Sequence, residues 1–322
     1  MTTALLDEPR VIPTSRSRGD VIFRRLALGA GLSTFVIMAL IGSFLLLRAM
    51  PAFREAGLHF FTQTLWQFST AHPTFGIAAV LYWTVVISVI ALVLALPLSV
   101  GTALFITEYA PIRLRRPLTA LVDLLAAVPS LIFGMWGLFF LQPKMLGLST
   151  WMSVHLSFIP IFRVTSAHFA SSPFIAGVVV ALMIVPIITS VSREVFSQTP
   201  PSEKEGALAL GGTRWGMIRT VVLPFGRGGV IGGSMLGLGR ALGETIAVAL
   251  ILSPSFFITP RILEGGGNSI AALIALHFGE ARQTELSGLM AAGLTLFAVT
   301  LLVNSLATVV VSRSRSGKGV EI

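Results

Sequence analysis

Residues 196–227 read FSQTPPSEKEGALALGGTRWGMIRTVVLPFGR and are the most organised stretch of the chain outside its apolar runs. Two prolines followed by Ser202 predict a helix start with Ser202 as N-cap, and the helix is expected over residues 203–210. Gly211-Gly212 is expected to end it. Apolar residues at helical spacing then predict a second helix over residues 213–224. The apolar stripe of this helix–turn–helix needs a partner, either its own membrane domain or another protein.

The rest of the chain is too apolar for a soluble protein. Of 322 residues, 54% are hydrophobic and 11% charged, and the mean hydropathy is +0.86. Soluble proteins carry about 25% charged residues. Most of this chain must therefore lie in lipid, and the expected class is an all-α membrane protein.

Six stretches are long enough to cross a bilayer core as helices, which takes about 20 residues. The first follows a long Arg-bearing segment and precedes no small-residue cleavage site, so an uncleaved span is expected. The six predicted spans are 26–47, 77–106, 118–141, 173–195, 228–252 and 287–311.

The basic residues indicate the orientation of these spans. They concentrate before the first span, in the second and fourth loops and after the last span, whereas the other loops hold few. The positive-inside rule predicts that both termini are cytoplasmic. The formal net charge of +9 is then explained by topology and anionic lipid rather than by nucleic acid.

The expected organisation is a cytoplasmic tail at 1–25, a first transmembrane helix with an outer interfacial segment at 26–76, a transmembrane domain at 77–312 and a basic cytoplasmic tail at 313–322. The loop at 196–227 belongs to the third of these. Aromatic residues favour the headgroup region. The residues that suggest an interfacial segment are Phe60, Phe61, Trp66 and Phe68.

The fifth span combines small residues with two charges. Gly229, Gly233 and Gly237 recur every four residues, which predicts close approach of another helix in lipid. Arg240 lies about 18 Å along the span, where an ionised Arg costs at least about 2.5–3.5 kcal/mol, so it should face protein or a wet cavity. Glu244 follows four residues later, within pairing reach on one helix face.

Two interpretations of Arg240 and Glu244 stay open at this point. One is an ion pair that fixes helix packing. The other is a guanidinium held by Glu244 in a substrate pathway, where its fork of donors suits an oxyanion.

Pro129 in the third span predicts a kink or a break. A broken span would turn backbone N–H groups and Ser130 toward an anion, which makes Ser130 a candidate pathway residue. Asp123, near the inner end of the same span, is expected to pair with Arg115 or Arg116.

Several kinds of site are excluded or unsupported by the sequence. Cys is absent, and the five His residues match no metal motif. No phosphate-binding G-x-x-x-x-G-K-[ST] motif occurs, and no Ser/His/Asp or paired-carboxylate set lies at membrane depth. We expect no catalytic, cofactor-binding or metal-binding residues in this chain.

The loop itself resembles a known family. Glu205-Gly206-Ala207, then Gly211, then Val221-x-Leu223-Pro224 is similar to the E-A-A-x3-G-x9-I-x-L-P loop of bacterial ABC importer permeases, departing from it at Gly206 and Val221. The resemblance implies the type I importer permease fold and a helix that inserts into the ATPase subunit. The implied coupling residues are Glu205, Gly206, Ala207, Gly211, Leu223 and Pro224.

A second resemblance is narrower. Residues 229–245, Val128-Pro129-Ser130 and 267–270 look like the PstC-type permeases of phosphate-specific ABC importers of the bacterial inner membrane. It implies phosphate as substrate, with Arg240, Glu244 and Ser130 in the pathway. It also implies three partners: a PstA-type permease, a PstB-type ATPase dimer that holds ATP and Mg²⁺, and an external PstS-type phosphate-binding protein.

The alternatives are a PstA-type partner subunit, a permease for sulfate, molybdate or phosphonate, and an ATP-independent anion transporter. The last leaves the organised loop at 196–227 without a role. A membrane-embedded hydrolase lacks the residues that it would need.

Overall fold

A computed structural model of the chain describes residues 18–67, 74–166 and 168–313, and most of them are helical. Within this part, six helical segments are long and apolar enough to cross a membrane, as predicted. They are Arg18–Ala56, Ala78–Tyr109, Ser130–His155, Pro173–Ser197, Arg214–Leu242 and Gln283–Val309.

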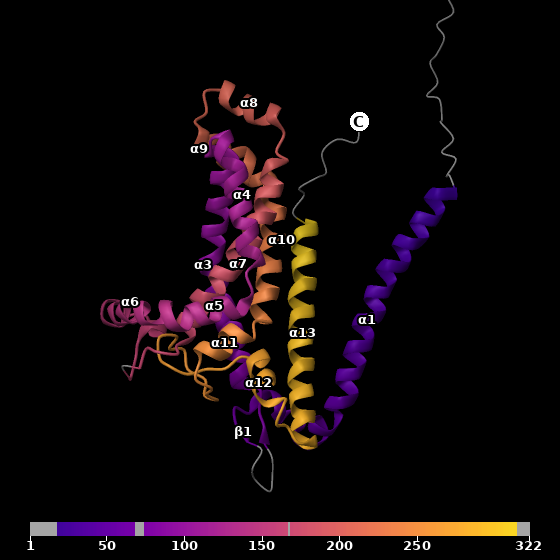
Figure 1. The fold of residues 1–322 in the computed structure, drawn as a ribbon, viewed down its shortest axis with the longest axis vertical. Coiled ribbons are helices and arrows are strands. Elements are labelled where there is room, and N and C mark those ends of the chain that lie inside the picture. The colour runs from indigo at the N-terminus through magenta and orange to yellow at the C-terminus, as the bar shows by residue number, and fades with distance from the viewer. Residues whose placement is uncertain (1–17, 68–73, 167, 314–322) are drawn as a thin grey trace, which may run out of the picture.

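Four helices run side by side along the long axis: α3 (Ala78–Leu104), α7 (Pro173–Ser197), α10 (Leu223–Leu242) and α13 (Gln283–Arg313) (Figure 1). The first helix, α1 (Arg18–Ala56), meets α13 at the lower end of the figure and stands away from it at the upper end. The bundle is therefore built on α3, α7 and α10, with α1 at its periphery.

The first helix is longer than its predicted span at both ends. It starts no later than Arg18, so residues 18–25 are helical rather than part of a tail, and it continues through Pro51 to Ala56. Hydropathy marks the lipid-facing part of a helix, whereas capping and local propensity decide where the helix stops. Residues 1–17 and 314–322, the remainder of the two predicted tails, lie outside the described residues.

The buried core joins α3 to α7. Trp83 and Ile87 of α3 pack with Ile175 and Ile184 of α7, and Val248 completes this cluster from a later helix. All five side chains are almost fully buried. Among the six candidate spans of the described residues, those that contain α7 and α3 bury the largest shares of their apolar windows within the chain.

The glycine repeat of the fifth span lies at the contact between α10 and α7, as predicted. A Cβ at Gly229 would stand 2.2 Å from Val195 Cγ2, and one at Gly237 would stand 2.8 Å from Ile188 Cδ1. Gly233 lies between them on the same face. A methyl group at Gly229 would overlap the branched Cβ of Val195, so the two helices approach closely there because this position has no side chain.

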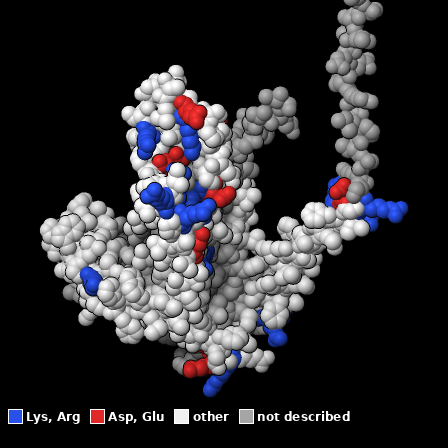
Figure 2. Space-filling model, turned by 45° about the horizontal axis from the view of Figure 1, so that its top comes forward, with Lys and Arg blue, Asp and Glu red and all other residues white. Residues whose placement is uncertain are grey.

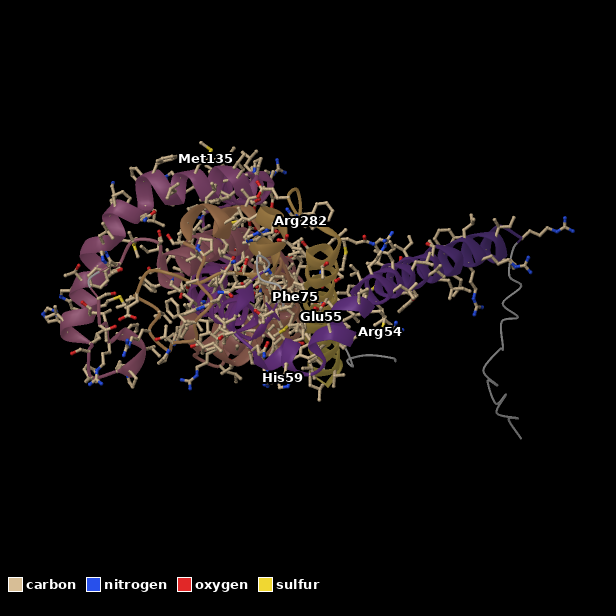
Figure 3. The ribbon with its side chains drawn as sticks, turned by 90° about the horizontal axis from the view of Figure 1, so that it is seen from below. Arg54, Glu55, His59, Phe75, Met135 and Arg282 are labelled. Atoms are coloured by element: carbon tan, nitrogen blue, oxygen red, sulfur yellow. The ribbon has the colours of Figure 1, made fainter. Side chains whose placement is uncertain are left out.

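The predicted third span, 118–141, is divided. Residues Val128 and Pro129 are extended, and the helix breaks there because Pro cannot continue the backbone ladder. The pieces are α4 (Ile112–Ala127), α5 (Ser130–Trp136), a π-helical turn (Gly137–Leu141) and α6 (Gln142–His155). Whereas α4 packs on α7, the α5–α6 segment curves across the bundle axis, as Figure 3 shows from below.

Small elements close the lower end of the bundle. Helix α2 (His59–Thr62) is followed by β1 (Trp66–Gln67), which pairs antiparallel with β2 (Thr74–Phe75). The predicted interfacial aromatics are only partly so: Phe61 is exposed, but Phe60 and Trp66 are buried, and Trp66 packs edge-on against Phe75. Phe68 lies outside the described residues.

Phe75 sits among the helix ends at this end of the molecule, with Arg54, Glu55 and His59 nearby at its rim (Figure 3). The edge-to-face contact between Trp66 and Phe75 adds to the burial of both rings.

A long loop, residues 252–269, joins α11 (Ile246–Ile251) to α12 (Ile270–His277) and is tied to the start of α3. The Tyr82 hydroxyl donates to the Thr259 carbonyl at 2.9 Å, and the Trp83 indole N–H donates to the Phe257 carbonyl at 3.0 Å. A short 3₁₀ turn, Pro160–Phe162, lies before α7.

Charged side chains gather at the upper end of the molecule and are sparse along its middle (Figure 2). One pairing differs from the prediction: Asp123 lies 3.9 Å from Arg193 Nη2 of α7, not beside Arg115 or Arg116. Arg115 instead donates from Nε to the Ala110 carbonyl. Sequence proximity favoured Arg115 and Arg116, whereas helix packing brings Arg193 to α4.

Candidate functional site

The helix predicted over 203–210 is α8 (Pro201–Ala209), at the upper end of the molecule (Figure 1). It begins earlier than predicted, with Pro200 in the N-cap position and no side-chain cap, so Ser202 is not the N-cap. Pro201 is the first helical residue. A proline suits this position because its fixed φ matches the helix and its missing N–H is not needed there. The helix ends as predicted, with Gly211 at φ +84°, a conformation that favours glycine.

The second helix begins where predicted but does not end at Pro224. Thr213 caps α9 (Arg214–Met217) by accepting from the Gly216 amide at 3.1 Å. A π-helical turn, Ile218–Val222, leads directly into α10. Pro224 is tolerated because it lies in the first turn of α10, just after this wider turn. The coupling segment, residues 200–224, therefore continues into the fifth span without a break.

The apolar stripe of the coupling segment is divided between two directions. Ala207, Met217 and Ile218 pack with the ends of α3 and α7. Leu208, Leu210 and Trp215 are exposed, Leu210 by 91%. The interpretation that the stripe packs on its own membrane domain is confirmed for one side. The other side lacks a cover in the part of the chain that the structure describes.

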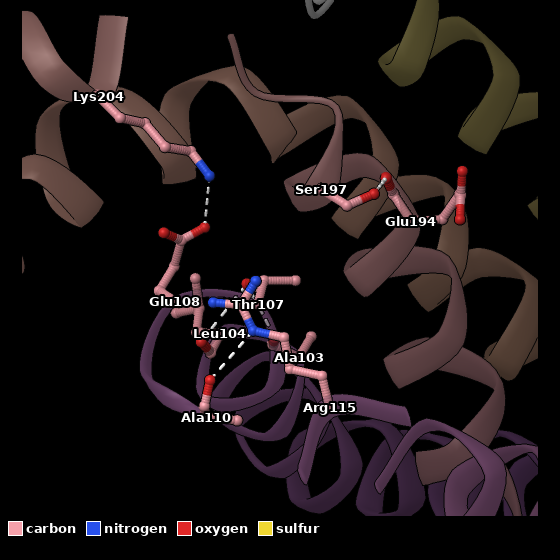
Figure 4. Close-up of polar contacts among 9 residues, drawn as sticks. All are labelled: Ala103, Leu104, Thr107, Glu108, Ala110, Arg115, Glu194, Ser197 and Lys204. Carbon is pink, nitrogen blue, oxygen red and sulfur yellow. Dashed lines mark hydrogen bonds and ion pairs between the residues drawn. The ribbon is translucent and has the colours of Figure 1, made fainter. Parts of the chain in front are cut away.

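An ion pair attaches α8 to the end of α3 (Figure 4). Lys204 Nζ lies 2.7 Å from Glu108 Oε1, and these side chains are 21% and 8% exposed. Glu108 lies in a π-helical turn, Phe105–Tyr109, that extends α3. The pair is partly desolvated, so each charge depends on the other.

The predicted coupling residues occupy different surroundings. Glu205 and Gly206 are exposed on α8, and a Cβ at Gly206 would meet no atom within 4 Å. Ala207 and Leu223 are half-buried against the apolar cluster beneath α8, and Pro224 is exposed. The half-buried members thus contribute to packing within the chain, and the exposed members do not.

The fifth span breaks at the predicted Arg240–Glu244 pair. Helix α10 ends at Leu242, and α11 starts again at Ile246. Arg240 is exposed in the last turn of α10, whereas Glu244 is 7% exposed and accepts a hydrogen bond from the Ala247 amide at 3.2 Å. Among the described residues, no ion pair joins Arg240 to Glu244. Residues four apart lie on one face only where the helix between them is continuous, and here it ends at Leu242.

Ser130 is half-buried at the start of α5, just after the break in the third apolar segment. One turn later, a Cβ at Gly134 would stand 2.9 Å from Ala247 Cα of α11. The short helix after each break thus packs on the other. The structure brings the neighbourhoods of Ser130 and Glu244 together, while the Arg240 guanidinium remains exposed.

Two features escaped the sequence analysis. Lys204 and Glu108 are 96 residues apart, and no local pattern connects them. The one sequence feature that pointed to this pair was a single carboxylate, Glu108, at the end of an apolar run. The hydrogen bond from the Ala247 amide to Glu244 was also missed, although Gly243 before an acidic residue is a sign of a helix stop followed by a helix start.

Comparison with known proteins identifies the family of this chain. Residues 95–316 match the model of the binding-protein-dependent transport system inner membrane component. The phosphate transport system permease protein PstC 2 of Mycobacterium tuberculosis is 42% identical over 98% of this chain and 100% of its own length. PstC of Mycobacterium leprae is 45% identical over 82% of this chain and 84% of its own. PstC of Xylella fastidiosa strain Temecula1 is 39% identical over 99% and 100%.

The fold is also found in solved ABC importers. A bacterial ABC transporter that imports the acidic polysaccharide alginate matches with a TM-score of 0.60 and 18% identity, over 92% of this chain and 98% of that chain. A second structure, of the alginate transporter in complex with its periplasmic protein, matches with a TM-score of 0.59 at 18% identity, over 95% and 100%. The chain belongs to the family of binding-protein-dependent transport system inner membrane components.

Proposed function

We propose that this chain is the permease subunit of an ATP-driven importer of inorganic phosphate. Relatives that align with almost its whole length are phosphate transport system permease proteins, which supports phosphate over sulfate, molybdate or phosphonate. Their PstC names also favour this subunit type over a PstA-type partner. The chain would form half of the translocation pathway, and a PstA-type permease would form the other half.

The exposed side of the coupling segment is the observation that supports coupling to an ATPase. Leu208, Leu210 and Trp215 form an apolar edge beside the exposed carboxylate of Glu205. Such an edge on a charged end of a membrane protein is typical of a protein-binding surface. A PstB-type ATPase dimer would bind it, hydrolyse ATP with its own Mg²⁺ and move α8.

Both termini and α8 are proposed to lie in the cytoplasm of a bacterial inner membrane. The start of α1, the end of α13 and α8 lie toward the same end of the molecule (Figure 1), which fits the excess of basic residues there. The opposite end, with α2, α12 and the loop 252–269, would receive an external phosphate-binding protein. We assign residues 77–312 to the transporting domain and 196–227 to its coupling loop.

Arg240 is the proposed anion-attracting group of the pathway. Its guanidinium is exposed on α10 where the span breaks, and Glu244 is engaged with the α11 backbone instead of neutralising it. A PstA-type subunit packed against this face would enclose Arg240, and Ser130 is the other residue proposed for the pathway. A guanidinium offers two parallel donors to a phosphate.

The test is uptake of radiolabelled phosphate by proteoliposomes that contain the complete complex with its external binding protein. We expect ATP-dependent uptake that excess unlabelled phosphate abolishes and that sulfate, molybdate and phosphonate leave unchanged. Uptake with ATP withheld would contradict the ATP-driven mechanism. Competition by another oxyanion instead of phosphate would contradict the substrate assignment and leave the permease assignment standing.

A further inference from the structure

The attachment of α8 to its own membrane domain is sparse. Along Pro201–Ala209, only Lys204 and Ala207 are partly buried, and the other side chains are exposed. The chain connections at the two ends of α8 lead to α7 and, through Gly211–Gly212, to α9 and α10. Neither connection reaches α3. A displacement of α8 can therefore reach α3 only through contacts between side chains.

Two side chains of α8 are partly buried against the membrane domain, and their contacts differ in kind. Ala207 touches the apolar cluster that contains Ala103 and Leu104 at the end of α3. A methyl contact is non-directional and lets one helix slide over another. The Lys204–Glu108 pair, at 2.7 Å and largely shielded from water, has a fixed direction and resists separation. The ion pair is therefore the contact that can transmit movement of α8 both toward α3 and away from it.

Glu108 is itself held firmly. It lies in the π-helical extension of α3, where the neighbouring Thr107 hydroxyl donates to the Ala103 carbonyl at 3.1 Å. The chain turns immediately afterwards, and the Arg115 side chain donates to the Ala110 carbonyl (Figure 4). A force on the Glu108 carboxylate would thus act on the helix and not on a loose loop.

Helix α3 carries such a force to the other end of the molecule. With its extension it runs unbroken over 32 residues, or about 48 Å. At its far end, Tyr82 and Trp83 hold the loop 252–269, and the Thr84 hydroxyl accepts from the Ile270 amide at 3.0 Å at the start of α12. One continuous helical segment thereby joins the coupling segment to the opposite loop, although Pro97 lies within it.

We infer that the Lys204–Glu108 ion pair is the link through which movement of α8 reaches α3 and, along it, the loop 252–269. The inference rests on the proposed function, since α8 moves only if an ATPase binds it. Lys204 and Glu108 are positioning residues that touch no substrate. They couple the ATP-driven step to the opposite face of the membrane.

The test uses the complete complex and a reporter of the far end. Because the chain has no Cys, Ser253→Cys in the exposed part of loop 252–269 is a unique thiol. Its rate of reaction with a membrane-impermeant maleimide is measured with and without ATP, together with ATP hydrolysis. Variants in this background are Lys204→Met, Glu108→Gln and the charge swap Lys204→Glu with Glu108→Lys.

We expect each single variant to keep the ATPase bound and active but to reduce the ATP-dependent change in thiol reactivity by about fivefold or more, with the charge swap restoring it. Asp123→Asn is the matched control. It removes a carboxylate from the Arg193 ion pair at the same end of the bundle, without touching α8, and should leave the response intact.

The link would be overturned by an unchanged response in the single variants, by a charge swap that fails to restore it in an assembled complex, or by no response to ATP in the parent Ser253→Cys complex. Loss of the ATPase from the single variants would also overturn it, because the pair would then serve docking. The reporter does not depend on phosphate. A normal response without phosphate uptake would therefore count against the proposed substrate alone.

Discussion

At the residue scale, Arg240 is the side chain on which the pathway proposal depends. Its exposure at the end of α10 leaves the guanidinium available to an anion once a partner subunit covers this face. Arg240→Gln should lower phosphate uptake by at least about tenfold, because a neutral amide provides neither charge nor a fork of donors. Uptake in proteoliposomes and co-purification of the subunits measure the two effects separately.

Arg54→Gln is the control for Arg240→Gln. Arg54 is also exposed, but it lies in the last turn of α1, outside the proposed pathway (Figure 3). It should transport at the parent rate. Normal transport by Arg240→Gln would show that the guanidinium has no part in the pathway.

Glu264 gives a prediction for pH. Burial raises the pKa of its carboxyl. The hydrogen bonds from the Thr165 hydroxyl and amide, together with the nearby Arg261, lower the pKa by more than burial raises it, so it lies below its ordinary value. A carboxyl with a lowered folded-state pKa stabilises the fold above its unfolded pKa of about 4.3, and this contribution is lost as the pH falls through the folded value.

The Glu264→Gln variant should therefore be less stable at neutral pH by about 1–3 kcal/mol, with the gap to the parent closing as the pH drops below about 4. Thermal unfolding in detergent across pH 7 to about 3.5 measures the gap, and Glu280→Gln, an exposed carboxyl, is the control. A gap that is independent of pH would mean that the ionised form of Glu264 contributes nothing special.

Residue-scale inference from the sequence was the least successful. The Arg240–Glu244 pair was expected from spacing, and spacing fails when the helix ends between the two residues. Asp123 was assigned to Arg115 or Arg116 because they are close in sequence, although its partner comes from α7. Side-chain partners depend on packing between distant segments, which no local pattern encodes.

At the element scale, the packing of α10 on α7 gives a matched pair of glycine variants. Gly229→Ala places a methyl group within 2.2 Å of Val195, whereas the space at Gly232 is open within 4 Å. Gly229→Ala should destabilise the protein by about 1–3 kcal/mol through overpacking. Gly232→Ala should be neutral or stabilise it by up to about 1 kcal/mol through better helix propensity.

Thermal unfolding of the two glycine variants in the same detergent checks this pair. Equal stability of both would mean that α7 and α10 adjust freely, contrary to close packing of their backbones.

The coupling segment gives the second element-scale prediction. Glu205→Lys reverses a charge on the exposed side of α8, and Gly211→Val forces a branched residue into φ +84° where the surrounding space is open. Each should lower the phosphate transported per ATP hydrolysed by at least about fivefold. The ratio is measured in proteoliposomes with both assays run on one preparation.

Gly206→Ala introduces the residue that the family pattern has at this open position in α8, so it is the control and should keep the ratio of the parent. If Glu205→Lys and Gly211→Val also keep it, α8 is not the site of coupling.

Elements were predicted well where one rule dominated. Apolar length marked the spans, and Gly211–Gly212 marked the end of α8. The division of the third apolar segment was foreseen only as an option, because Pro129 allows both a kink and a break. The continuation of the fifth span through Pro224 depends on the wider π-helical turn, which has no recognised sequence signal.

At the scale of the whole molecule, the proposed topology can be tested with single thiols in the Cys-free chain. Leu58 is 83% exposed beside α2, and Ile112 is 83% exposed at the start of α4, toward the other end. An impermeant maleimide added to intact cells should label Leu58→Cys and not Ile112→Cys. Inverted vesicles should give the opposite pattern, and the reverse result in either preparation would invert the assigned orientation.

The overall arrangement could be predicted only in outline. Six apolar segments and their basic flanks indicated a membrane bundle, but not that α1 stands away from it or that α5–α6 crosses its axis (Figure 1). These segments bury little of their apolar surface within the chain, so nothing in their own sequence fixes where they lie. Their surroundings, lipid and partner subunits, belong to the assembly.

The π-helical turn Ile218–Val222 also sets the direction in which α8 points around the axis of the fifth span. It holds one residue more than a regular turn, and each residue of an α-helix advances the chain by about 100°. Shortening this turn by one residue would rotate α8 and α9 by about that angle around the axis of the fifth span. Lys204 would then point away from Glu108. The number of residues in the coupling segment thus fixes the rotation of α8 about the fifth span as well as its distance from that span.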